Sequence, residues 1–113
     1  IDYDHLYELE QRLGPQHTSQ TLIAGLERVL DLQREIEQAR IAGDSPALAG
    51  GARALKATAS EIGLTAVSRI ASDIDIAIAQ GEPEAAMREV PSLQRKIAVT
   101  WRELAKAYPS IAA

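Results

Sequence analysis

The sequence predicts an all-α protein, and three features support this prediction. Apolar residues recur at steps of three and four through every long segment, which is the period of an amphipathic helix. Short turns rich in glycine and proline separate these segments. Aromatic residues make up only 4% of the 113 residues and Phe is absent. The core must therefore consist of Leu, Ile, Val and Ala, which favours closely packed helices.

The first two helices are separated by a glycine-proline turn. A short helix over residues 1–13 ends at Gly14-Pro15, because glycine adopts a left-handed stop and proline cannot continue the hydrogen-bond ladder. A long helix follows, starting at Thr18 or Ser19 and ending at Ala42-Gly43. Mixed charges on its outer side predict a solvated face. Its expected buried line consists of Leu22, Leu26, Val29, Gln33 and Ile36.

Three further helices complete the chain. The third starts at a cap formed by Asp44 or Ser45 and ends at Gly63. The fourth covers 65–80, although its D-I-D-I-A-I run alternates like a strand, because the helical repeat around that run is longer. The last runs from residue 82 to Pro109, and Pro91 either kinks it or divides it in two.

Short turns between long helices predict that consecutive helices are antiparallel. The last four helices would form an up-down-up-down four-helix bundle, and the short N-terminal helix would cover one end. The length fits one domain over residues 1–113. Because the sequence does not begin with Met, we expect a mature form or a domain excised from a longer protein.

Composition excludes several classes of function. A net charge of −4 and a pI of about 5.1 argue against a nucleic-acid binder and a polybasic membrane-surface module, which both need a basic footprint. The absence of cysteine excludes disulfides and thiolate metal sites. No apolar run reaches the roughly 18 residues of a membrane-spanning helix, and no signal peptide is visible. We therefore expect a cytoplasmic protein without direct membrane insertion.

No catalytic, cofactor or metal motif is present, so the chain is not expected to be an enzyme. It has no nucleophile elbow, phosphate-binding loop or H-E-x-x-H sequence. His5 and His17 lie twelve residues apart without a paired carboxylate pattern, so they predict no metal site. Asp73 and Asp75 point to different sides of a helix and form no dyad.

The segment from Ser45 to Leu64 is the expected functional centre, because it predicts a helix with two unlike faces. One face steps by four and three residues, as a buried stripe does. The other places two cations among small side chains, a surface that another protein can approach closely. The buried stripe is Leu48, Ala52, Leu55, Ala59 and Ile62. The cationic face is Arg53, Lys56, Ala57 and Ser60.

Two consecutive glycines, Gly50 and Gly51, lie inside this helix. Each costs about 1 kcal/mol relative to alanine in a helix interior. Either a neighbouring helix or a partner approaches closely there, or the start of the helix is simply weak.

The run R-A-L-K-A-T-A-S-E-I-G resembles the signature of histidine-containing phosphotransfer (HPt) domains, H-x-L-K-G-(S/A)-(A/S)-x-x-x-G. Leu55, Lys56, Ala59 and Gly63 stand at matching places. The preceding A-G-D-S-P-A-L-A is similar to the turn before the signature helix, and I-D-I-A-I-A-Q-G-E resembles a later segment of the family. The resemblance covers nearly the whole chain, and it implies a five-helix fold.

The sequence departs from the family at the reactive position. The phospho-accepting His falls on Arg53 and a small Gly falls on Ala57, while Lys56 keeps its place. A guanidinium is always charged and is a poor nucleophile, so Arg53 should not carry phosphate. The resemblance then implies a docking module of a two-component phosphorelay. It would bind a response-regulator receiver domain or a histidine kinase through Arg53, Lys56, Ala57, Ser60, Ala49 and Gly50.

Two alternatives stay open. Arg53 could replace the natural His of a genuine phosphotransfer domain, or the chain could be a helical-bundle scaffold or dimerisation module. The resemblance implies a larger parent signalling protein, and one candidate is a membrane-bound sensor kinase with this chain as a cytoplasmic domain. The expected state of the domain itself is a monomer without a cofactor.

Overall fold

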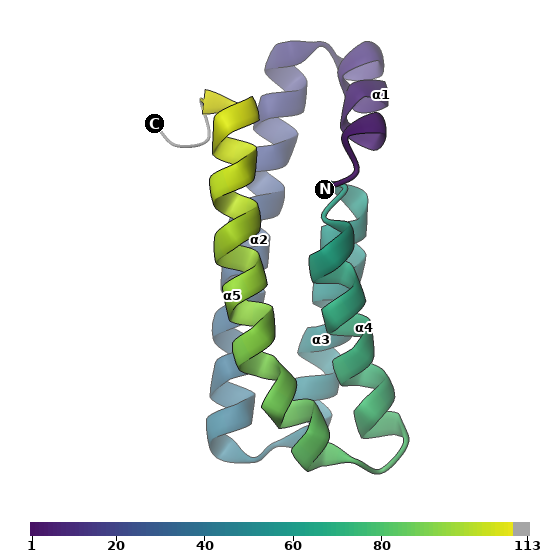
Figure 1. The fold of residues 1–113 in the computed structure, drawn as a ribbon, viewed down its shortest axis with the longest axis vertical. Coiled ribbons are helices and arrows are strands. Elements are labelled where there is room, and N and C mark those ends of the chain that lie inside the picture. The colour runs from purple at the N-terminus through teal and green to yellow at the C-terminus, as the bar shows by residue number, and fades with distance from the viewer. Residues whose placement is uncertain (110–113) are drawn as a thin grey trace.

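A computed structural model describes residues 1–109. They form five α-helices and no strand, which confirms the all-α class. Four long helices lie side by side, and the short first helix lies beside one end of the second (Figure 1). The helices are α1 (Tyr3–Leu13), α2 (Pro15–Ala42), α3 (Ser45–Glu61), α4 (Thr65–Ala79) and α5 (Pro83–Ala107).

The second helix begins earlier than expected. Gly14, with a φ of +82°, ends α1 and directly precedes α2, whose first residue is Pro15 rather than Thr18 or Ser19. A single glycine at positive φ turns the chain, and proline fits the first helical position because its missing N–H has no partner there. The buried Thr18 hydroxyl donates to the Gly14 carbonyl at 2.8 Å, inside the first turn.

The last helix continues through Pro91, so a division into two helices is wrong. Proline costs the helix a hydrogen bond, yet Val90 and Leu93 on either side are completely buried. Their burial holds this part of α5 against the core and outweighs the local preference of the sequence. The D-I-D-I-A-I run likewise lies in a helix, α4, as expected.

Buried apolar side chains from all five helices form one core. The expected line of α2 is right at four of its five positions, and the exception is Gln33. Gln33 is half-buried, and the neighbouring Leu32 is 1% exposed and occupies the core instead. The largest completely buried side chains include Leu6, Leu22, Leu26, Ile36, Leu55, Ile74, Leu93 and Leu104.

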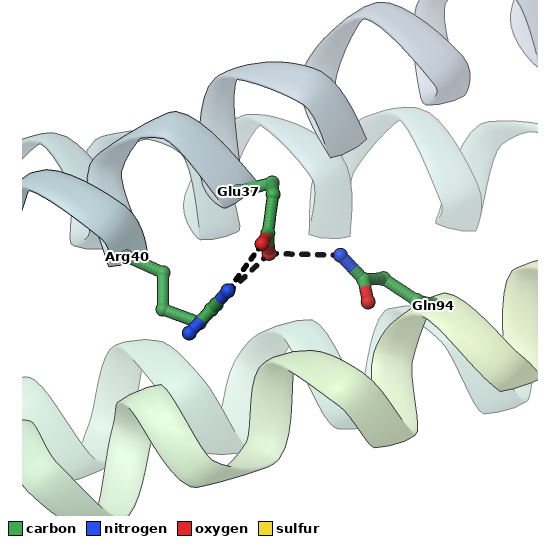
Figure 2. Close-up of polar contacts among 3 residues, drawn as sticks. All are labelled: Glu37, Arg40 and Gln94. Atoms are coloured by element: carbon green, nitrogen blue, oxygen red, sulfur yellow. Dashed lines mark hydrogen bonds and ion pairs between the residues drawn. The ribbon is translucent and has the colours of Figure 1, made fainter.

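A polar link joins α2 to α5 (Figure 2). The Glu37 carboxylate accepts hydrogen bonds from the Arg40 guanidinium on its own helix and, at 2.9 Å, from the side-chain amide of Gln94 on α5. The hydrogen bond from Arg40 holds the pKa of Glu37 below its ordinary value of 4.5, and the Gln94 amide acts in the same direction.

This link predicts a small stability term that depends on pH. The pKa of Glu37 is lower in the folded protein than in the unfolded chain. Its contribution to the free energy of unfolding is therefore complete at pH values above the unfolded-state pKa, and it is lost as the pH falls through the folded-state pKa. Glu37→Gln should lower the free energy of unfolding by about 0.5–1 kcal/mol at about pH 7 and leave it unchanged at about pH 2, as measured by urea unfolding. Glu35→Gln, at an exposed site on the same helix, should have no effect. An equal loss from Glu37→Gln at both pH values would contradict the link.

Candidate partner-binding surface on α3

Local signals fix both ends of α3. The Asp44 carboxylate accepts a hydrogen bond from the Ala47 N–H at 3.1 Å, and Pro46 lies in the first turn. Asp44 is therefore the cap, which the sequence had left open between Asp44 and Ser45. At the other end Gly63 has a φ of +75°, and Leu64 donates to the Ala59 carbonyl at 2.8 Å.

The two faces of α3 are as the sequence predicts. Every member of the expected buried stripe, from Leu48 to Ile62, is at most 3% exposed. The opposite face is exposed at Arg53, Lys56, Ala57 and Ser60. We call these four residues the cationic face.

The remaining two candidates for partner binding differ from each other. Gly50 is half-buried, and apart from its chain neighbours and the backbone of its own helix no described atom lies within 4 Å of the position that a Cβ would take. Ala49 is only 6% exposed, at the edge of the core, so it offers a partner almost no surface and we leave it out of the cationic face. Its burial follows from its place one helical turn before the completely buried Ala52.

Arg53 pairs with an acid on the neighbouring helix. Its Nη1 lies 3.4 Å from Oδ1 of Asp75 on α4, and the two side chains are 64% and 28% exposed. An exposed pair of this kind contributes about 0–1 kcal/mol, so the pair can open at little cost. A guanidinium has five N–H donors, and the Asp75 contact uses one of them. Most of the hydrogen-bonding capacity of Arg53 therefore remains available to a partner.

Lys56 and Ser60 line a polar hollow of about 390 Å³ between α3 and α4, to which α1 also contributes. The Ser60 hydroxyl lies 2.8 Å from the hydroxyl of Ser68 on α4. Arg69, in the same turn of α4, adds a second cation to the wall. Sequence reasoning missed Ser68, Arg69 and the pairing of Asp75, because they belong to another helix and only tertiary packing brings them to α3.

The first helix is attached to the end of α3. The Nε2–H of His5 donates to the Glu61 carbonyl at 2.8 Å, and the Asp2 N–H donates to the Gly63 carbonyl at 2.7 Å. His5 thereby lines the polar hollow although it lies far from Lys56 in sequence. His17 is exposed on α2. Neither histidine lies on the cationic face.

Residues 1–109 contain no group of three or more His, Cys, Asp or Glu side chains placed to hold a metal ion. Within the same range, no helix has the length and apolar character needed to cross a membrane. The polar groups at the site are three cations (Arg53, Lys56 and Arg69), the hydroxyls of Ser60 and Ser68, and the carboxylate of Asp75.

Comparison with known proteins identifies no relative: no family model, no curated protein and no solved structure matches the chain. The resemblance to HPt domains therefore depends on the residues of α3 and the segments around it.

Proposed function

We propose that this chain is an HPt-like docking module of a two-component phosphorelay, which binds a receiver domain or a histidine kinase without carrying phosphate. On this proposal α2 to α5 form the antiparallel up-down-up-down bundle of that family, α1 covers one end, and residues 1–113 are one domain of a larger signalling protein. The observation that carries the proposal is the exposed guanidinium of Arg53 at the position of the phospho-accepting His.

The chemistry of Arg53 favours binding over transfer. A guanidinium stays protonated at any ordinary pH and cannot accept a phosphoryl group as a neutral imidazole nitrogen does. It is, however, well suited to carboxylates, which it binds with two parallel hydrogen bonds. The active site of a receiver domain is a cluster of acidic groups. Arg53 would contact that cluster where the family presents its His.

The surroundings of Arg53 support close approach by a partner. Ala57 and Ser60 are small and exposed, and Gly50 has open space where a side chain would project. Lys56 places a second positive charge one helical turn away. A surface of this kind lets a partner reach the guanidinium without steric obstruction. The Asp75 carboxylate competes with the partner for the same group, so the internal ion pair should weaken docking.

The proposal is tested by titrating candidate receiver domains, free of phosphate, and candidate histidine kinases into the protein by calorimetry. Arg53→Ala should weaken binding at least tenfold, which corresponds to about 1.4 kcal/mol. Asp75→Asn should strengthen it, because Arg53 no longer has an internal competitor. Arg28→Ala, which removes an exposed cation from α2, should leave the affinity unchanged. No binding to any receiver domain or histidine kinase, or binding that is indifferent to Arg53→Ala, would refute the proposal.

One variant distinguishes genuine phosphotransfer from docking. Arg53→His restores the family residue, so incubation with a phosphorylated receiver and Mg²⁺ should label the introduced imidazole if the rest of the site is intact. The unaltered protein should stay unlabelled under the same conditions. Labelling of the unaltered protein at any residue would overturn the docking proposal.

A further inference from the structure

A groove lies between α2 and α5, the two helices that Figure 1 shows side by side across the molecule from α3 and α4. Its main hollow has a volume of about 490 Å³. Apolar side chains from both helices line it, and Trp101 is among them, half-buried and in contact with the core. The lining residues are Leu30, Gln33, Gln94, Ile97, Ala98, Trp101 and Arg102.

The groove is elongated. A second hollow of about 300 Å³ shares Gln33 and Gln94 with the first and extends along α2 to Gln38. From Leu30 to Gln38 the helix rises about 12 Å, at 1.5 Å per residue, which is roughly two helical turns. A compact small molecule would fill one hollow and leave the other empty. A rod-shaped occupant such as an α-helix follows both, as amphipathic helices do in the grooves that recognise them.

Two polar groups in this groove lack partners within residues 1–109. The side-chain oxygen of Gln33 has almost no accessible surface and accepts no hydrogen bond there, so an occupant reaches it only after the Gln33 side chain rotates. Arg102 is exposed and lines the main hollow, and its guanidinium forms no ion pair with any other residue of 1–109. By contrast, the cations beside the second hollow are neutralised, since Arg34 pairs with Asp31 and Arg40 pairs with Glu37.

We propose that this groove binds an amphipathic α-helix of a partner protein, with the apolar face of that helix on Trp101 and a carboxylate at its edge paired with Arg102. The unpaired positive charge at the apolar end selects an acidic helix over a basic one. The inference rests on the α2–α5 groove alone and does not depend on the proposed function of the cationic face.

Trp101 provides a direct readout, because it is the only tryptophan in the chain. The probe is a synthetic amphipathic helix with Leu at positions i, i+3, i+4 and i+7 and Glu along the edge. A second peptide carries Lys in place of Glu. Titrated into the whole protein, the acidic peptide should change the Trp101 emission in a saturable manner and bind at least tenfold more tightly than the basic peptide.

The charge-reversal variant makes the test specific. Arg102→Glu should reverse the preference between the two peptides. The matched control is Arg95→Glu, which makes the same change of charge on α5 but at a residue that contacts Ser92 and lines a different hollow, so the preference should remain. The proposal is refuted if the acidic peptide does not saturate, if the peptides bind equally, or if both variants behave alike. It is also refuted if sedimentation shows a dimer whose dissociation alone changes the Trp101 emission, because a second copy would then occupy the groove.

Discussion

Replacing Leu55 with alanine should lower the free energy of unfolding by about 2–5 kcal/mol, while the same replacement at the adjacent Lys56 should change it by less than about 0.5 kcal/mol. Leu55 is completely buried on the core face of α3, so its truncation removes packed methyl groups and leaves a cavity. Lys56 is exposed on the cationic face, and its side chain forms no ion pair within residues 1–109. Chemical unfolding of the two variants measures the difference.

The same two variants separate folding from partner binding. Lys56→Ala should leave the protein as stable as the original chain, so any loss of affinity for a receiver domain would be a loss of contact at the surface. Leu55→Ala should reduce affinity only under conditions in which part of the protein is unfolded. Comparable destabilisation by both variants would contradict the two-faced description of α3 and the position of the cationic face with it.

The faces of α3 could be predicted from sequence because burial there has a simple period. Charged or small residues separate its large apolar residues, so the large apolar side chains gather on one side of the helix. On α2 the prediction of Gln33 as a core residue failed, because Leu32 and Gln33 project about 100° apart on opposite sides of the buried arc, and periodicity alone does not decide which of them faces the core. The helix packs against both α3 and α5, and that arrangement places Leu32 in the core and Gln33 in the groove.

The partners of the site residues lie beyond what the sequence could predict. Asp75 follows Arg53 by 22 positions, and no local pattern links the two. Their contact depends on the rotation of α4 about its axis relative to α3, which the packing of both helices determines. The same holds for His5. Hydrogen bonds between the N-terminal residues and the end of α3 bring it to the last turn of that helix. Periodicity predicts which side chains are exposed, but tertiary packing decides what they meet.

The sequence left open whether Gly50 and Gly51 allow close approach of a neighbour or only weaken the start of α3. The structure gives a different answer for each glycine. At Gly51 an added Cβ would lie 2.9 Å from Cγ1 of Ile36, a completely buried side chain of α2. Gly51 therefore permits close approach of α2 and α3. At Gly50 an added Cβ would meet nothing within 4 Å. That glycine has no packing role in residues 1–109, and it weakens the helix as any interior glycine does.

Alanine at these positions should consequently have opposite effects. Gly50→Ala should raise the free energy of unfolding by up to about 1 kcal/mol, the difference in helix propensity. Gly51→Ala gains the same propensity but must displace the stiff, β-branched Ile36 from a packed core, at a cost of about 1–3 kcal/mol. Because the propensity term cancels between the two variants, their difference in chemical unfolding measures the steric cost alone. Equal stabilisation by both would mean that Ile36 moves aside at no cost, and the close packing of α2 against α3 at Gly51 would then not be required for folding.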